Sequence, residues 1–232
     1  MTNQTEIRSG DGAQDTGSAV GRARQIGAVP IITLHDAADA VPLAAALSAG
    51  SIPCMEITLR TPSAIEALRA VRQARPDILL AAGTVLTIDQ LAAVADAGVD
   101  LVVTPGLDPA LVEQSHARGI EVLPGVATPT EIQTARSLGL QAVKFFPAEA
   151  LGGARTLTIL ADVYPDLSFV PSGSITPALL PDYLRIPAVA ACGGSWLVKP
   201  DLLAGRAFDR ITALAADTAR QVGQARTTVV QP

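Results

Sequence analysis

The chain has 232 residues, of which 49% are hydrophobic and 17% are charged, and its net charge is −5. This composition is typical of a globular protein with a large core and excludes a disordered or fibrous chain. No basic stripe and no apolar run long enough to cross a bilayer occurs, so neither a nucleic acid nor a membrane is an expected partner. Two cysteines without a CxxC motif, and a start that lacks a secretory pattern, predict a cytoplasmic protein.

The first 20 residues are rich in Gly, Ser, Thr, Gln and Asp, which predicts a disordered tail. After it, short apolar runs alternate with helical patterns rich in alanine and leucine. The predicted strands are VPIITL (29–34), CMEITL (54–59), ILLAAG (78–83), LVVTPG (101–106), EVLPG (121–125), AVKFFP (142–147), SFVPSG (168–173) and AVAACGG (188–194). The predicted helices lie near 37–49, 62–75, 87–97, 108–118, 129–138, 153–163, 176–183 and 206–224.

Eight strand–helix units of this spacing predict a single α/β domain over residues 21–226, folded as a (β/α)8 barrel. An open doubly wound sheet has the same alternation of elements, and periodicity alone does not separate the two folds. The number of units favours the barrel, and so do the polar residues that follow many different strands. In a barrel the carboxyl ends of all strands meet at one mouth, where the chemistry takes place.

Lys144 lies inside one of these apolar strands, between Val143 and Phe145. The only other lysine, Lys199, belongs to a predicted surface loop. Burial disfavours the charged ammonium, and a neutral amine can attack a carbonyl group to form a Schiff base. The alternative is a structural lysine that reaches the barrel rim or forms an ion pair with Glu56. The catalytic reading is preferred because several other polar residues are expected at the same mouth.

Glu56, Thr58 and Arg60 are spaced by two along the second predicted strand, so they share one face of it. If that face points into the barrel, a carboxylate and a guanidinium enter the cavity that contains Lys144. Glu56 is suited to proton transfer, or alternatively to acting as a buried counter-ion. Arg60 is suited to bidentate binding of a carboxylate, or alternatively is a surface arginine at a helix entrance.

Two loops rich in small residues, PSGSIT (171–176) and CGGSWL (192–197), follow the last two predicted strands. Backbone N–H groups in such loops can approach an anion, and barrels frequently bind phosphate at this place. The alternative is a pair of tight turns. The two histidines, His35 and His116, are far apart and show no metal-binding spacing, so no metal site is expected.

In this order along the chain, MEITLRT, AAGTVLT, VTPGL, LPGVATPTE, KFFPAEALGG and CGGSWLV resemble the 2-keto-3-deoxy-6-phosphogluconate (KDPG) aldolases, a family that includes 4-hydroxy-2-oxoglutarate aldolases. The resemblance covers about residues 25–222. It implies a class I aldolase on a TIM barrel, usually a homotrimer, that needs no metal or other cofactor. The implied activity is a carbon–carbon lyase of the Entner–Doudoroff pathway of carbohydrate metabolism, acting on a phosphorylated keto acid as its small-molecule substrate.

The resemblance also implies a role for each matching residue. Lys144 matches the Schiff-base lysine and Glu56 the general acid/base. The implied substrate-binding residues are Arg60 and Thr84 for the pyruvate carboxylate, Pro105 and Phe146 as pocket walls, Ser172 near the hydroxyls, and Gly173, Ser174, Gly194 and Ser195 for the phosphate. Ser174 departs from the usual glycine, and its Cβ restricts φ. Its hydroxyl can contact the phosphate, or its bulk can weaken that subsite.

The leading hypothesis is cleavage of KDPG to pyruvate and glyceraldehyde 3-phosphate, or of 4-hydroxy-2-oxoglutarate to pyruvate and glyoxylate. The galactonate epimer of KDPG is an alternative substrate. A phosphosugar isomerase or epimerase with Glu56 as its base is an alternative enzyme. A sugar-phosphate sensor without catalytic activity and a pyridoxal-phosphate enzyme are further alternatives.

Overall fold

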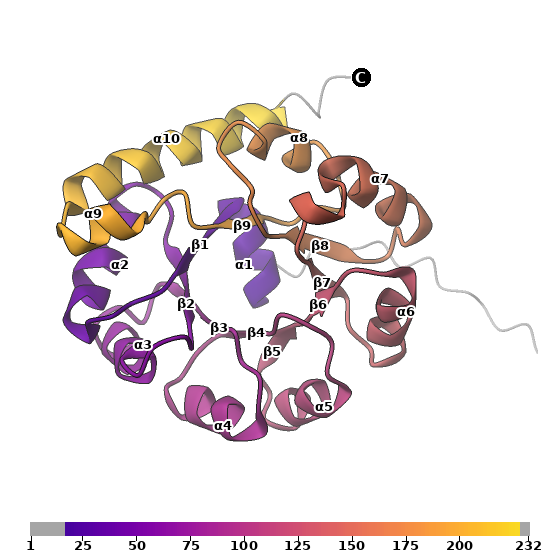
Figure 1. Ribbon diagram of the computed structural model, residues 1–232, viewed down its shortest axis with the longest axis horizontal. Coiled ribbons are helices and arrows are strands. Elements are labelled where there is room, and N and C mark those ends of the chain that lie inside the picture. The colour runs from indigo at the N-terminus through magenta and orange to yellow at the C-terminus, as the bar shows by residue number, and fades with distance from the viewer. Residues whose placement is uncertain (1–16, 228–232) are drawn as a thin grey trace, which may run out of the picture.

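The computed structural model describes residues 17–227 and has a TIM-type α/β architecture, with parallel strands in an inner ring and helices around it (Figure 1). The strands are β1 (Ala28–Ile32), β2 (Cys54–Thr58), β3 (Leu79–Gly83), β4 (Leu101–Val103), β5 (Glu121–Leu123), β6 (Gly125–Val126), β7 (Ala142–Phe145), β8 (Ser168–Pro171) and β9 (Cys192–Gly194). The helices are α1 (Ala19–Ile26), α2 (Ala40–Ala49), α3 (Ala64–Ala74), α4 (Ile88–Asp96), α5 (Pro109–Ala117), α6 (Pro129–Ser137), α7 (Gly153–Val163), α8 (Leu180–Leu184), α9 (Pro200–Ala204) and α10 (Phe208–Thr227), with 3-10 turns η1 (Ala37–Asp39) and η2 (Glu149–Leu151).

The strands form two parallel sheets, one with the order β5-β4-β3-β2-β1-β9 and one with the order β6-β7-β8. The fifth predicted strand is interrupted at Pro124, which has no N–H to donate to a neighbouring strand. The Pro124 carbonyl still accepts a hydrogen bond from the Lys144 amide at 2.8 Å. On the other side, single bridges pair Phe169 with Val189 and Ser172 with Gly193. The two sheets are therefore neighbours at both of their edges.

Capping residues explain where several helices begin, and they agree with the predicted entrances. Thr87 accepts a hydrogen bond from the amide of Gln90 at the start of α4. Asp108 caps α5 in the same way, ahead of a proline in the first turn. Thr128 and Glu131 form a capping box at the start of α6. These helices all begin on the side where the strands end, so their first turns surround the mouth.

Helix α1 was not predicted, and it corrects the expected boundary of the tail, because its first residues, Ala19 and Val20, are buried. The carboxylate of Glu121, at the start of β5, accepts hydrogen bonds from the amides of Ala19 at 2.6 Å and Val20 at 3.1 Å. An anion at the amino end of a helix satisfies amides that have no partner within the helix. The rest of the expected tail, residues 1–16, lies outside the described residues.

The last turn of α1 is attached to the start of β8, where Arg24 donates to the hydroxyl of Ser168 at 2.8 Å. Helix α1 thus lies across the amino ends of the strands, inside the ring in Figure 1, and leaves the opposite end as the mouth. Of the helices in residues 17–227, none is long and apolar enough to cross a membrane.

Candidate active site

Lys144 and Glu56 meet inside the barrel although they come from different sheets. Lys144 lies on β7 and Glu56 on β2, and the Lys144 Nζ is 3.4 Å from Oε1 of Glu56. Their side chains are 9% and 5% exposed. Removing two such charges from water costs about as much as their attraction returns, so a buried pair is weak evidence for stability. The position of the pair at the mouth favours a chemical role.

Gly83 on β3 makes the space that Glu56 occupies. It lies beside β2, where it is paired with Thr58. A Cβ at Gly83 would lie 2.2 Å from Oε1 of Glu56. Any side chain at this position would displace the carboxylate from Lys144. The Lys144 Nζ is also 5.4 Å from the centre of the Phe146 ring, within the range of a cation–π contact.

The other residues predicted to hold the pyruvate part follow β2, β3 and β4 at the same mouth. Arg60 is exposed, and no ion pair with any carboxylate in residues 17–227 is present for it. Thr84 is half-buried and has a φ of 60°. A β-branched residue rarely adopts this left-handed backbone, and such strain is concentrated at functional sites. Pro105 is exposed just after β4.

The residues predicted to hold the distal part lie on two adjacent loops, after β8 and β9. Ser172 is 3% exposed, whereas Ser174 and Ser195 are exposed to solvent. Gly173 has a φ of 111°, and a Cβ there would lie 3.0 Å from the Cα of Pro147. Ser174 has a φ of 59°, a conformation in which glycine would be unstrained.

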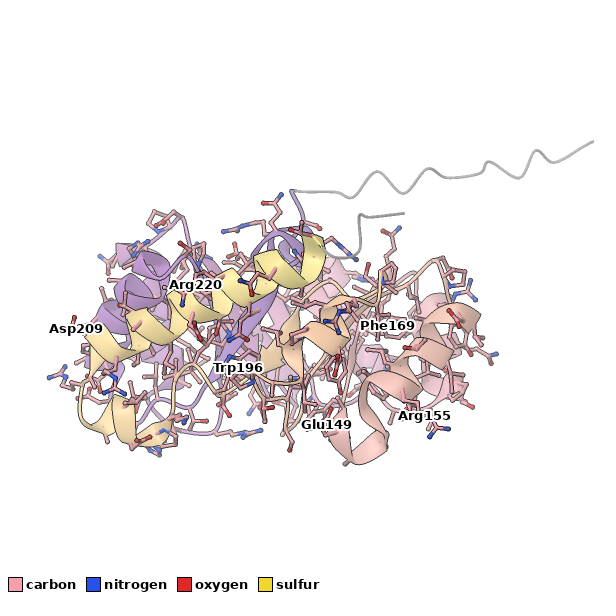
Figure 2. The ribbon with its side chains drawn as sticks, turned by 90° about the horizontal axis from the view of Figure 1, so that it is seen from above. Glu149, Arg155, Phe169, Trp196, Asp209 and Arg220 are labelled. Carbon is pink, nitrogen blue, oxygen red and sulfur yellow. The ribbon has the colours of Figure 1, made fainter. Side chains whose placement is uncertain are left out.

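Trp196 explains why position 194 is a glycine. A Cβ on Gly194 would lie 1.8 Å from Cζ3 of the Trp196 ring. The ring is held in place by its Nε1, which donates to Oγ1 of Thr218 on α10 at 3.3 Å (Figure 2). From the sequence, the glycine at position 194 is interpreted as part of a loop that can approach an anion, and its contact with the Trp196 ring is not predicted. Detecting that contact from the sequence would require knowing that the loop after β9 folds back onto α10.

The two histidines and the two cysteines take no part in this arrangement. His35 and His116 are both exposed, and His116 is in the last turn of α5, away from the mouth. Cys54 and Cys192 are buried free thiols, and burial raises the pKa of each above its usual value. Thiols in this state are poor nucleophiles, so both cysteines act as small core residues. Within residues 17–227, no group of three or more His, Cys, Asp or Glu side chains could hold a metal ion.

An amine beside a carboxylate, buried at the mouth of a TIM-type barrel, is the arrangement of an enzyme that forms a Schiff base with a carbonyl substrate. The family model described as KDPG and KHG aldolase matches residues 20–214. The chain belongs to this family of aldolases, which are carbon–carbon lyases.

Individual relatives agree with this assignment. The 2-dehydro-3-deoxy-phosphogluconate aldolase of Treponema pallidum (strain Nichols) is 46% identical over 195 residues, which cover 84% of this chain and 93% of the relative. Among solved structures, the KDPG aldolase of Legionella pneumophila, with pyruvate captured as a covalent carbinolamine, is 36% identical with a TM-score of 0.83 and covers 86% of this chain and 97% of that one. The KDPG aldolase of Zymomonas mobilis ZM4 with 3-phosphoglycerate is 38% identical with a TM-score of 0.79. The match covers 86% of this chain and 94% of that one.

Proposed function

We propose that this chain is a class I aldolase that cleaves KDPG to pyruvate and glyceraldehyde 3-phosphate, with Lys144 as the Schiff-base residue and Glu56 as the proton carrier. The observation that carries the proposal is the buried Lys144–Glu56 pair, with 3.4 Å between Nζ and Oε1. The covalent pyruvate carbinolamine of the Legionella relative supports it, because such an intermediate requires an amine nucleophile.

The reaction begins when the Lys144 amine attacks the C2 ketone of the substrate. Loss of water from the carbinolamine gives an iminium ion, which can accept an electron pair. Glu56 takes the proton of the C4 hydroxyl, the C3–C4 bond breaks, and C4 leaves as an aldehyde. The electron pair of that bond forms an enamine on the pyruvate part. Glu56 then returns a proton to C3, and water hydrolyses the iminium to release pyruvate and the free amine.

Arg60 and Thr84 hold the substrate carboxylate next to the reacting ketone, and Pro105 and Phe146 form the walls of that pocket. The absence of a carboxylate partner for Arg60 among residues 17–227 supports this role, since the substrate can then supply one. The ring of Phe146 also lies 5.4 Å from the Lys144 amine, measured to the ring centre.

The distal phosphate binds to backbone N–H groups of the loops after β8 and β9. The residues that contribute are Gly173, Ser174, Gly194 and Ser195, with Ser172 beside the substrate hydroxyls. The usual place of phosphate sites in barrels supports this assignment. The phosphorylated ligand of the Zymomonas relative supports it as well. The same chemistry on 4-hydroxy-2-oxoglutarate, which has a distal carboxylate instead, gives pyruvate and glyoxylate.

The barrel is proposed to have eight units, with β5 and β6 counted as one strand interrupted at Pro124. It forms one domain over residues 21–226, extended at its start by Ala19 and Val20. A cytoplasmic homotrimer is the proposed state, on the basis of the family resemblance. A keto acid is the proposed small-molecule partner.

Trapping with borohydride tests the Schiff base directly. The chain has only two lysines, so Lys199 is a control within the same protein. Incubation with pyruvate and borohydride is expected to add a pyruvate-derived mass to Lys144 and none to Lys199. A label on Lys199, or no label from a protein that still releases pyruvate, would refute the assignment. Pyruvate release from KDPG, its C4 epimer and 4-hydroxy-2-oxoglutarate then ranks the substrates.

A further inference from the structure

A hydrogen bond between a tyrosine and a glutamate joins two segments at the mouth. Neither of these two residues has a role in the proposed mechanism. The hydroxyl of Tyr183, on α8, donates to Oε1 of Glu149. Glu149, which is labelled in Figure 2, lies in η2 just before α7. Tyr183 is 1% exposed. Burial, followed by the Glu149 carboxylate, raises the pKa of the Tyr183 phenol above its usual value, so the hydroxyl remains a donor. The space for this contact depends on Gly153, where a Cβ would lie 3.0 Å from Oε1 of Glu149.

The segment that contains Glu149 is also joined, through its backbone, to the loop that precedes α8 in the chain. Residues 146–149, here called the lysine loop, follow the strand of Lys144, and residues 172–174, here called the distal loop, follow β8. The amide of Ala148 donates to the carbonyl of Ser172 at 2.8 Å, and the amide of Glu149 donates to the carbonyl of Gly173 at 3.3 Å. The lysine loop therefore lies directly against the distal loop.

Tyr183 adds a second, side-chain link between these two parts of the chain. Helix α8 follows the distal loop in the chain, so the Tyr183–Glu149 bond links the lysine loop to the segment that leaves the distal loop. A substrate held at one end by Lys144 and at the other by the distal loop requires a fixed spacing between the two. We propose that Tyr183 and Glu149 are positioning residues that set this spacing, and that they thereby favour a keto acid with a distal phosphate over a shorter one. This inference rests on the proposed function.

Removing the hydroxyl has two expected consequences. A hydrogen bond to a charged group contributes more than a neutral one, and its loss leaves a partly buried carboxylate without its donor. That carboxylate would then be free to move beside a loop proposed to bind a dianion, and like charges repel. Both consequences act on binding of the phosphate and leave the Lys144–Glu56 pair in place.

The test compares Tyr183→Phe with the wild type on two substrates. The KM for KDPG is expected to rise about tenfold, as the loss of one charge-assisted hydrogen bond implies. The KM for 4-hydroxy-2-oxoglutarate and the rate of borohydride trapping of pyruvate on Lys144 are expected to stay within about twofold. Glu149→Ala should reproduce the effect, whereas Glu149→Gln, whose amide oxygen can still accept the tyrosine proton, should show a smaller one.

The chain provides a matched control in its only other tyrosine. Tyr164 is 5% exposed and donates its hydroxyl to the carbonyl of Pro129 at 3.3 Å, between α7 and α6. Tyr164→Phe removes an equivalent atom and is expected to leave both KM values unchanged. Thermal unfolding checks each variant, and if Tyr183→Phe does not fold, the two Glu149 variants decide the question.

An unchanged KM for KDPG in Tyr183→Phe and Glu149→Ala would overturn the inference. An equal loss on both substrates and in trapping would also overturn it, because it would indicate a general structural role. Absence of pyruvate release and of trapping in the wild type would instead refute the proposed function, and this inference with it.

Discussion

The two ends of the proposed site are built in different ways. At the pyruvate end, Lys144 and Glu56 are side chains on strands and are only 8% and 4% exposed as residues. At the phosphate end, the expected ligands are backbone N–H groups of loops, and Ser174 and Ser195 are exposed. Under the proposed function, the reaction depends on buried side chains of the strands, whereas the choice of substrate depends on the loops.

Strand pairing explains the difference. Lys144 is aligned with Gly125 on one side and with Val170 on the other, so neighbours on both sides fix its position. The distal loop has one bridge of this kind, between Ser172 and Gly193. Loops tolerate substitution better than the strands that carry them. The departure from the family pattern, Ser174, lies in the more tolerant part.

The largest expected effect comes from the pyruvate end. Lys144→Arg keeps a positive charge but removes the amine nucleophile, so pyruvate release is expected to fall by at least about 10³-fold. The melting temperature should stay close to that of the wild type, because a charged partner for Glu56 remains. A coupled assay for pyruvate measures the loss. Substantial residual turnover would show that the chemistry does not depend on this strand.

Glu56→Gln is expected to have the second largest effect. The amide can occupy the same space beside Gly83 but cannot carry the proton between C4 and C3, so kcat is expected to fall about 10²- to 10⁴-fold. Glu66→Gln, at an exposed position on α3, is the matched control and should leave kcat unchanged. The proton-transfer role would be wrong if both variants had the kcat of the wild type.

Gly194→Ala tests the phosphate end. The added methyl group would meet the Trp196 ring, and overpacking of this kind lowers the free energy of unfolding by about 1–3 kcal/mol. The KM for KDPG should rise while borohydride trapping of pyruvate continues. Gly223→Ala is the control, since no atom of residues 17–227 outside its own helix backbone and chain neighbours lies within 4 Å of a Cβ there. If trapping fails together with phosphate binding, the two ends are not separable.

Ser174→Gly is expected to have a smaller effect, in the opposite direction. A serine with a φ of 59° is strained, and relieving the strain should raise the free energy of unfolding by about 1 kcal/mol. If the side chain only obstructs the phosphate, the KM for KDPG falls. A higher KM in this variant would show that the Ser174 hydroxyl binds the phosphate, and the phosphate end would then depend partly on a side chain.

The sequence predicts the pyruvate end better than the phosphate end, for physical reasons. Alternation along β2 and the rarity of lysine locate Glu56 and Lys144, because strand periodicity is a local property. The Gly83 contact with Glu56 depends on the register between β2 and β3. The packing of Trp196 on Gly194 depends on α10. Such contacts join distant segments, and no short pattern encodes them.

Helix α1 is missed for a related reason. Its sequence, AVGRARQI, contains two arginines, a glycine and a glutamine and follows a polar stretch, so local patterns favour a tail. The helix is stabilised by Glu121 and Ser168, which are more than 100 residues away in the chain. The interruption of a strand at Pro124 is a smaller correction, and the proline itself is its cause.

The smallest expected effect concerns the two cysteines. Each lies on a strand that carries a residue of one end of the site, two positions before that residue. Cys54 precedes Glu56 by two residues on β2, and Cys192 precedes Gly194 by two residues on β9. Both are fully buried, and burial raises the pKa of each thiol, so the reactive thiolate is scarce at pH 8. Iodoacetamide is therefore expected to label neither cysteine in the native protein and both in denaturant, as mass spectrometry can measure. Faster labelling of Cys192 than of Cys54 would show that β9 itself opens, and that the contrast between the two ends extends from the loops into the strands.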